Sequence, residues 1–317
     1  MRSILYRNGL AVDHDLAELS DPEDGSALWI DVEQSETENI QKLAKIFSFH
    51  PLALEALLGE PGRSRLDRFE NQFLLQAYAT RVDADDRLEP LPILAVLTRN
   101  TMITVRPVKT IDMEVVRDQW EANPELLSGG SIAMFWSLLD NVVDSHFDTV
   151  QALDERTGDL EAGVFADTPN IRELQHSCFI LHREVTRLRR LSMPLRDIAN
   201  SILRHDPEGA SGEITPYLQD VYDHALRVAD WADNIHDTLS TLFDSILNSQ
   251  SNQLNIVMKK VTSWAAIIAV PTAITGFFGM NVSYPLFGTV IGFWVSLGLI
   301  AASTALLYWQ FKRSDWL

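Results

Sequence analysis

Two long uncharged runs of apolar residues near the C-terminal end constrain this chain more than any other feature. Residues 261–278 and 288–309 contain no charged side chain, and runs of about 18–22 residues are long enough to cross a hydrocarbon core. A helix of that length buried in a soluble protein normally carries a polar face, whereas these runs show only scattered Ser, Thr and Gly. The pattern predicts a transmembrane hairpin, with spans at about residues 261–280 and 288–310.

The charged residues beside the two runs predict their orientation. Lys259 and Lys260 precede the first run, Lys312 and Arg313 follow the second, and the loop between the runs is uncharged. Positively charged flanks stay on the cytoplasmic side of a membrane. We therefore expect a multi-pass protein of the cytoplasmic (inner or plasma) membrane, with both termini in the cytoplasm. The first residues of the chain lack the apolar stretch of a signal peptide.

Composition narrows the possible partners and activities. The net charge of −18 and the sequence pI near 4.7 argue against nucleic acid, which binds basic surfaces, and suit the attraction of cations. Cys178 is the only cysteine, which excludes an intrachain disulfide and a thiolate metal cluster. The sequence shows no nucleophile–base constellation, phosphate loop or zincin motif, so we expect neither an enzyme nor an organic cofactor.

The pattern of residues predicts an α+β membrane protein built from four parts. Residues 1–125 predict a cytoplasmic α/β domain with a mixed sheet, in which Arg99 and Asn100 form a hairpin turn. Its expected strands are residues 3–6, 27–32, 73–82, 91–97 and 102–105, and its expected helices are residues 36–47 and 51–58. The other parts are long cytoplasmic helices in residues 126–212 (131–165 and 170–204), a stalk helix in residues 213–258 and the transmembrane hairpin in residues 259–317.

One face of the helix predicted at residues 213–278 is small or polar along its length, and we call this face the polar seam. In the first span and in the turns just before it, the seam consists of Asn255, Met258, Thr262, Ala265, Ala269, Thr272, Gly276 and Gly279. Before the span it includes Asp230, Asp237 and Asp244. The solvated face of an amphipathic stalk would look similar, but the continuation in phase into the span favours one water-filled axis.

A single hairpin cannot enclose such an axis, because two helices would leave the polar lining facing lipid. Several copies arranged as a symmetric ring would enclose it. Rings of the three aspartates would then concentrate cations in the lumen. Met258 and Val261 would form an apolar constriction near the cytoplasmic face, of the type that gates by dewetting.

The end of the first run carries a motif that resembles a known family. Gly279-Met280-Asn281 closes this run, a short loop and a second run follow, and the chain ends in a basic segment before Trp316-Leu317. Together with Asn255-Ile-Val-Met258-Lys and Pro271-Thr272, these features resemble the CorA family of divalent-cation (magnesium) channels. The resemblance implies a funnel-shaped homopentamer in the lipid bilayer whose long stalk helix continues into the pore-lining first span.

The resemblance also implies a role for the motif at the pore entrance. A ring of Asn281 side chains and Gly279 carbonyls would offer neutral oxygens to hydrated Mg²⁺, which sheds its water reluctantly and must be bound weakly enough to be released. A tight turn between helices is the alternative reading of Gly279-Met280-Asn281. The chain departs from many magnesium-transporting members in that its loop after the motif has no acidic residue.

A second segment resembles the part of the family that supplies a regulatory Mg²⁺ site between subunits. It is Tyr217-Leu-Gln-Asp220-Val-Tyr-Asp223-His224, and the resemblance points to Asp220 as a metal ligand. The carboxylates expected to complete the site are Asp83, Asp85 or Asp86 of a neighbour, or Asp144. A solvated stalk carboxylate is the alternative for Asp220. His176 and His182 are six residues apart, which does not place them on one helix face as a metal site.

The resemblance implies passive Mg²⁺ uptake, with Co²⁺ or Ni²⁺ as further substrates, gated by intracellular Mg²⁺ at intersubunit acidic sites. Two other readings stay open. A zinc transporter of the ZntB type, which often works with a proton gradient, shares the topology and the motif. A membrane-tethered sensor without transport would need the hairpin only as an anchor. The absence of His and Cys from the seam favours a hard, hydrated ion over zinc.

Overall fold

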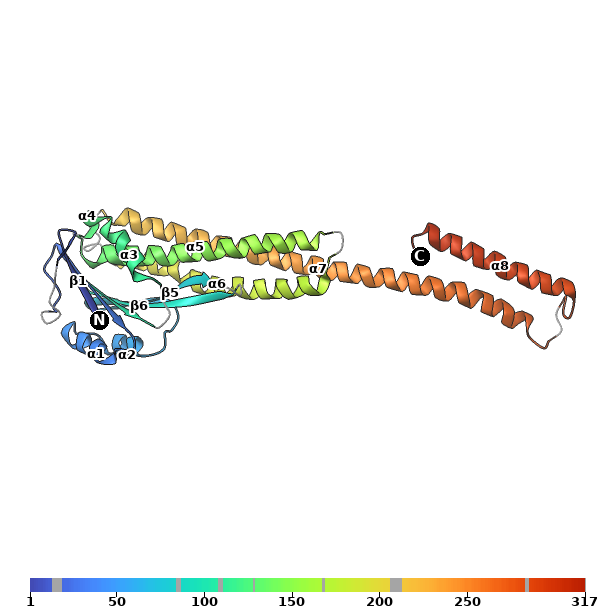
Figure 1. Ribbon diagram of the computed structural model, residues 1–317, viewed down its shortest axis with the longest axis horizontal. Coiled ribbons are helices and arrows are strands. Elements are labelled where there is room, and N and C mark those ends of the chain that lie inside the picture. The colour runs from blue at the N-terminus through green and yellow to red at the C-terminus, as the bar shows by residue number, and fades with distance from the viewer. Residues whose placement is uncertain are drawn as a thin grey trace. The chain divides into compact units, whose positions relative to one another are not determined.

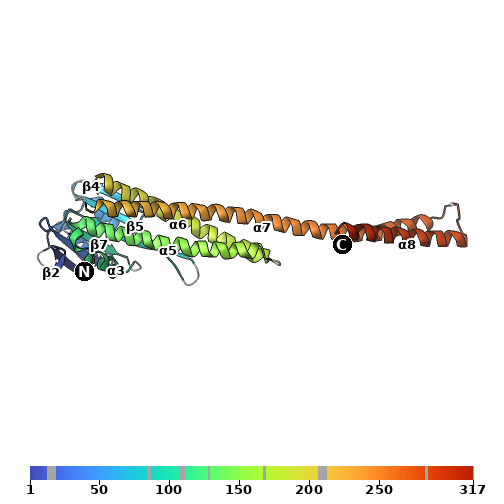
Figure 2. The same ribbon diagram turned by 90° about the horizontal axis from the view of Figure 1, so that it is seen from above.

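The structure is a computed structural model that describes residues 1–12, 19–83, 87–107, 111–127, 129–166, 169–205, 213–282 and 285–316. The chain divides into two compact units, Met1–Leu242 and Phe243–Leu317. Helix α7 (Thr215–Phe278) belongs to both units. Figures 1 and 2 show the course of the elements.

The first unit contains a seven-stranded mixed sheet in the order β2-β1-β3-β7-β6-β5-β4. Strands β3 and β7 pair in parallel and all other neighbours pair antiparallel, which confirms the predicted mixed sheet. The turn at Arg99 and Asn100 joins β6 to β7 as predicted. The strands are β1 (Arg2–Arg7), β2 (Leu10–Val12), β3 (Ser26–Glu33), β4 (Arg65–Phe69), β5 (Gln72–Val82), β6 (Leu88–Leu97) and β7 (Thr101–Arg106).

Helices cover both faces of this sheet because its central strands are apolar on both faces. In β3, Leu28 and Ile30 point to one side, where they pack with Leu43 of α1 (Thr37–Ile46) and Leu57 of α2 (Pro51–Leu58). Trp29, between them in sequence, points to the other side and joins the larger core of α3, α5, α6 and α7. Figure 1 shows α1 and α2 on one side of the sheet and α3 and α5 on the other.

Three long helices complete the first unit, as the sequence predicts: α5 (Ser131–Val164), α6 (Ile171–His205) and the first part of α7. One face of α7 is apolar and buried in this unit, since Val221, Val228 and Ile235 are no more than 2% exposed, and Val221 belongs to the larger core. Two short helices, α3 (Met113–Glu121) and α4 (Pro124–Leu127), were not predicted. They cover the sheet with Trp120, which is fully buried and meets Trp29 edge to face at 5.2 Å.

A buried histidine ties the sheet to two of these helices. His146 of α5 has no exposed surface, and its Nδ1 atom lies 2.9 Å from the Ser192 hydroxyl of α6. Its Nε2 atom lies 2.7 Å from the carbonyl oxygen of Tyr78 in β5. Burial lowers the pKa of His146 to about 4, because the interior disfavours the charged ring. The ring is therefore neutral at physiological pH.

The second unit is a helical hairpin of the end of α7 and α8 (Val290–Arg313). The hydroxyl of Thr289 caps α8 by accepting a hydrogen bond from the Gly292 amide at 3.0 Å. Gly292 lies so close to the Leu286 carbonyl that a Cβ atom would clash with it. At the other end of α8, the Ser263 hydroxyl of α7 donates to the Trp316 carbonyl at 3.5 Å.

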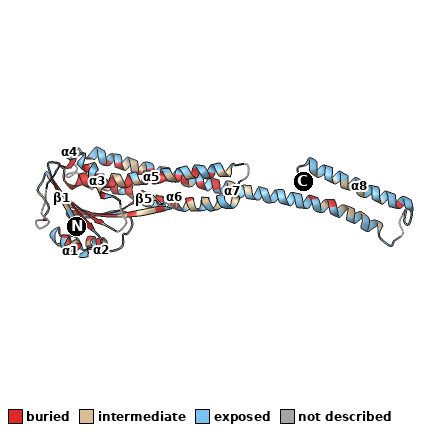
Figure 3. Ribbon diagram, in the orientation of Figure 1, coloured by how far each residue is buried: buried red, intermediate tan, exposed pale blue. Residues whose placement is uncertain are grey.

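Both helices of this hairpin are long and apolar enough to cross a membrane. Their large apolar side chains are mostly exposed, as the pale blue ribbon in Figure 3 shows. Trp264 of α7 and Trp294 of α8 are more than half exposed. An apolar surface of this extent needs lipid or other protein copies around it.

Candidate functional site

The polar seam lies on the side of α7 that α8 leaves free. Ser263 and Ile267 are buried against α8, with 0% and 9% of their surface exposed. At about 3.6 residues per turn, the seam positions lie on the far side of the helix from these two residues. The seam residues of the span, which are all exposed, are Asn255, Met258, Thr262, Ala265, Ala269, Thr272, Gly276 and Gly279. Val261, the other predicted constriction residue, is also exposed.

The predicted entrance motif follows directly on the last residue of α7. The Gly279 amide still donates to the Thr275 carbonyl at 2.9 Å, and the Met280 amide donates to the Phe277 carbonyl at 3.3 Å. A Cβ atom at position 279 would lie 3.0 Å from that Thr275 oxygen, so a larger residue would crowd the end of the helix. Gly279, Met280 and Asn281 are all exposed.

The three predicted lumen carboxylates point away from the protein core. Asp230, Asp237 and Asp244 are exposed and follow one another at intervals of seven residues along α7. Seven residues correspond to about two helical turns, so the carboxylates lie on one face of the helix. Their function in a lumen stays a prediction.

A cluster of acidic residues and one histidine joins α5 to α7 in the first unit. Asp140 and Asp144 of α5 and His224 of α7 each offer one ligand atom, and these atoms all lie within 4.8 Å of one another. Asp220 is next to them, with its Oδ1 atom 3.6 Å from the Nε2 atom of His224. A hydrogen bond of 2.6 Å from the Gln119 amide holds the Asp140 carboxylate in place.

The two aspartates of α5 in the cluster have raised pKa values. Burial raises the pKa of Asp140, and the negative charge of Asp220 raises it too. Burial also raises the pKa of Asp144, with a further rise from the charge of Asp140. These shifts reflect the partial burial of Asp140 and Asp144 and the repulsion between neighbouring carboxylates, whereas the Asp220 side chain itself is 65% exposed. The Nδ1 atom of His224 is buried and has no hydrogen-bond partner among the residues that the structure describes.

The cluster brings together two of the predicted regulatory residues, Asp144 and Asp220, and adds two that were not predicted. Asp140 precedes Asp144 by four residues, and His224 follows Asp220 by four. This spacing places each pair on one helix face. The spacing is the feature of the sequence that could have indicated Asp140 and His224 as further members of the site. The pairing of α5 with α7 could not be seen in the sequence.

Of the other predicted regulatory carboxylates, the structure describes only Asp83, and it lies outside the cluster. Asp83 follows β5, where its Oδ1 atom accepts a hydrogen bond from the Arg87 amide at 2.8 Å. Its charge acts on Arg156 of α5, which is not part of the cluster. Asp85 and Asp86 lie outside the described residues. A contribution from Asp83, Asp85 or Asp86 of a neighbouring subunit stays a prediction.

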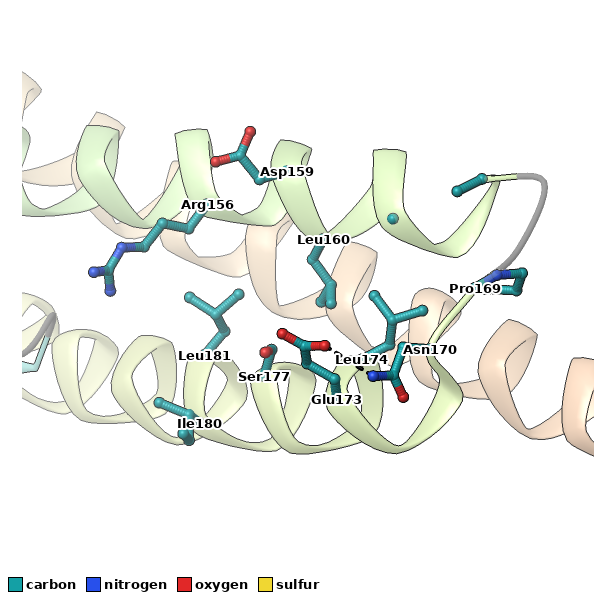
Figure 4. A pocket seen from close by; sticks show the side chains of 12 residues that line it. Arg156, Asp159, Leu160, Pro169, Asn170, Glu173, Leu174, Ser177, Ile180 and Leu181 are labelled. Carbon is teal, nitrogen blue, oxygen red and sulfur yellow. Dashed lines mark hydrogen bonds between the residues drawn. The ribbon is translucent and has the colours of Figure 1, made fainter.

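A separate pocket of about 590 Å³ lies between the facing ends of α5 and α6 (Figure 4). Leu160, Leu174 and Leu181 form its apolar part, and Arg156 and Glu173 are among its polar residues. Glu173 accepts a hydrogen bond of 2.9 Å from Asn170. Its described lining carries both signs of charge beside an apolar wall, and Figure 4 shows the Asp159 carboxylate pointing away from that of Glu173.

Comparison with known proteins identifies the family. The family model described as CorA-like Mg²⁺ transporter protein matches residues 24–313, which is most of the chain. The chain belongs to the CorA family. The cobalt/magnesium transport protein CorA of Thermotoga maritima is 30% identical over 284 residues, which cover 89% of this chain and 80% of that relative.

Solved structures show that the whole CorA fold is present. The full-length CorA magnesium transporter of Methanocaldococcus jannaschii matches with a TM-score of 0.77 at 22% identity, over 100% of this chain and 99% of that one. The cytoplasmic domain of ZntB from Vibrio parahaemolyticus matches 78% of this chain and 98% of its own length, with a TM-score of 0.59 at 11% identity.

Membership of the CorA family places the chain among divalent-cation transporters, with Mg²⁺ as a substrate of the family. CorA proteins are membrane transporters and channels rather than enzymes. The similarity to both CorA and ZntB concerns the fold at these identities, so it does not separate Mg²⁺ from Zn²⁺. The choice of ion therefore depends on the chemistry of the seam and the entrance.

Proposed function

We propose that this CorA-family protein is a homopentameric channel for passive Mg²⁺ uptake across the cytoplasmic membrane, with both termini in the cytoplasm. The observation that carries the proposal is the continuous exposed seam of α7, which lies opposite α8 and ends at Gly279-Met280-Asn281. The exposed apolar residues of α8 suit a lipid-facing position. In a ring of copies, the seam would then face the axis and lipid would surround α8.

The composition of the seam suits a hydrated hard ion. Thr262, Thr272 and Asn255 supply neutral oxygen groups, while Ala265, Ala269 and the glycines leave space for water. His and Cys, the ligands that zinc prefers, are absent from the seam in the sequence. A pore of this chemistry would pass Mg²⁺ with most of its water, and it would admit Co²⁺ and Ni²⁺ as ions of similar charge.

In this channel, the entrance would select the ion, and the constriction would open and close the pore. A ring of Asn281 amide oxygens would hold the hydrated ion without a fixed charge, so that the ion leaves as readily as it enters. Gly279 would leave backbone carbonyls accessible at the same level. Met258 and Val261 would close the cytoplasmic end of the span by an apolar ring that excludes water.

Intracellular Mg²⁺ would regulate the ring through the carboxylates at the cluster. An ion bound by Asp220, with Asp140 or Asp144 and a carboxylate of a neighbouring subunit, would bridge like-charged surfaces and hold a symmetric closed ring. Loss of this ion would leave unscreened carboxylates in a partly dry site, where their repulsion is stronger than in water. The ring would then loosen and the pore would open.

Flux measurements on purified protein in proteoliposomes test the proposal. We expect Mg²⁺ influx without a pH gradient in the wild type, loss of influx in Asn281→Ala, and normal influx in the control Val282→Ala. Zn²⁺ influx that requires a pH gradient, with little Mg²⁺ influx, would instead identify a ZntB-type transporter. Absence of both fluxes in a correctly folded wild type would support a membrane-tethered sensor and contradict the proposal.

A further inference from the structure

Two histidines from different helices meet in the first unit, apart from the acidic cluster. His182 of α6 and His236 of α7 have their ring centroids 4.5 Å apart, with ring planes tilted by 44°. Both side chains are half-buried, so the rings are held by the helices while water and ions can reach them. The residues are 54 positions apart in the sequence, and only the packing of α6 against α7 brings them together.

We propose that His182 and His236 form a two-imidazole site for a divalent transition-metal ion such as Zn²⁺, Ni²⁺ or Co²⁺. Neutral imidazole is a ligand that these ions prefer, whereas Mg²⁺ prefers oxygen. Each Zn–N bond is about 2.0–2.1 Å long, so two rings that share an ion must lie nearly in contact. The centroid distance of 4.5 Å brings these two rings that close.

Contacts on either side fix the register of the two helices at the site. One turn before His182, the Cys178 thiol of α6 lies 3.6 Å from the Leu239 carbonyl of α7. On the other side, the Nε atom of Arg189 lies 2.5 Å from the Oδ1 atom of Asp233. Because these contacts flank the histidines, the rings are positioned before any ion arrives, which lowers the entropy cost of binding.

The charge and burial around the two rings favour the binding of a cation by neutral imidazole. The Oδ1 atom of Asp237 lies 3.6 Å from the Nδ1 atom of His236, which is too long for a hydrogen bond but places a negative charge beside the ring that attracts a cation. Burial lowers the pKa of His182, and the nearby His236 and Arg189 lower it too. The ring therefore stays neutral to a lower pH, as metal binding requires.

The remaining charges near the rings come from both helices. Asp233 and Asp237 of α7 are acidic, and Arg189 of α6 is paired with Asp233. The pairing offsets the repulsion that Arg189 would exert on a bound cation. With two protein ligands, the ion would keep water in its other positions. Its effect would be to cross-link α6 to α7, so that transition metals act on α7 separately from Mg²⁺ at the acidic cluster.

Calorimetric titration of the full chain in detergent tests this site. Zn²⁺ is titrated in the presence of excess Mg²⁺, which occupies the oxygen sites, and the experiment is repeated with His182→Ala, His236→Ala and the control His176→Ala. His176 is on the same helix and is not part of the pair. We expect one Zn²⁺ binding event that survives His176→Ala and weakens about tenfold or more in each of the other variants.

A second variant keeps the test decisive if a histidine substitution disturbs folding. Asp237→Asn leaves both rings in place and changes a side chain that is 87% exposed, so the fold should be unaffected. Loss of this negative charge beside the rings should weaken Zn²⁺ binding by a few fold. Unchanged Zn²⁺ affinity in His182→Ala or in His236→Ala, with a normal melting temperature, would overturn the two-imidazole site. A binding event that disappears only in His224→Ala would assign the ion to the acidic cluster instead.

Discussion

The Oδ1 atom of Asp220 lies 3.6 Å from the Nε2 atom of His224, one helical turn further along α7. His224 in turn shares a ligand-sized space with Asp140 and Asp144 of α5. This relationship links the helix that carries the polar seam to a group of carboxylates that attract cations. A change in charge at the cluster therefore acts directly on α7.

Removing the charge of Asp220 should reduce the protection that Mg²⁺ gives to the protein. We expect Asp220→Asn to weaken the rise in melting temperature and the protease resistance caused by Mg²⁺, because the ion loses a carboxylate ligand. The matched control is Asp223→Asn, whose carboxylate accepts a hydrogen bond of 3.2 Å from Gln219 on the exposed side of α7. Equal Mg²⁺ protection in both variants would contradict a ligand role for Asp220.

The stability of the protein should fall as the pH drops from about 6.5 to 4, because of His146. Burial lowers its pKa from 6.5 to about 4 in the folded protein, so the unfolded chain binds the proton first. The contribution is complete above pH 6.5 and is lost progressively below it. A shift of this size corresponds to about 3 kcal/mol. Thermal unfolding of the detergent-solubilised protein across this range measures the loss.

The variant His146→Gln should remove that part of the pH dependence. Glutamine keeps a donor and an acceptor for Ser192 and Tyr78 but does not titrate. We expect lower stability at pH 7 and a flatter stability profile between pH 6.5 and 4. A profile as steep as that of the wild type would show that other groups cause the acid sensitivity.

The constriction predicted at Val261 should limit flux when intracellular Mg²⁺ is high. In Val261→Thr, a hydroxyl replaces a methyl group at nearly constant volume, so the ring would hold water more readily and Mg²⁺ leak should increase. The same substitution at Val270, which is half-buried towards α8, provides the control. Proteoliposomes loaded with Mg²⁺ measure the leak, and equal leaks in the two variants would count against a gate at Val261.

The loop of the hairpin depends on a close approach at Gly292. A methyl group there would clash with the Leu286 carbonyl, and we expect Gly292→Ala to destabilise the protein by about 1–3 kcal/mol. Gly298 lies on the same helix, and a methyl group at that position would meet no described atom within 4 Å. Gly298→Ala should therefore be neutral or slightly stabilising. Melting temperatures of the two variants compare the effects directly.

The sequence predicted secondary structure best in segments where a periodic pattern of side chains continues over many residues. The runs that became α5, α7 and α8 are so long and regular that their type was clear, and the first residue of α2, Pro51, was predicted because proline is favoured there. Strand β4 was missed because its sequence, Arg65–Phe69, is charged and lies at an edge of the sheet. Helix α3 was missed because only tertiary packing shows that Trp120 is a core residue.

The candidate sites were likewise predictable only where they depend on one helix and not on the packing between helices. The polar seam follows from the period of a single helix, so the sequence alone predicted its members. The clusters of Asp144 with His224 and of His182 with His236 depend on which helix faces which. That information is carried by the packing of α5, α6 and α7 and not by the spacing within any one of them.

The most direct test of the central claim is the accessibility of the seam to a water-soluble thiol reagent. A variant without cysteine is available through Cys178→Ala, since Cys178 is the only cysteine. Single cysteines are then placed at Thr272 on the seam and at Trp264, which is exposed but lies on another side of α7. Modification at position 272 should block Mg²⁺ flux, and position 264 should neither react nor affect flux. Block at 264 with free flux at 272 would contradict a water-filled axis along the seam.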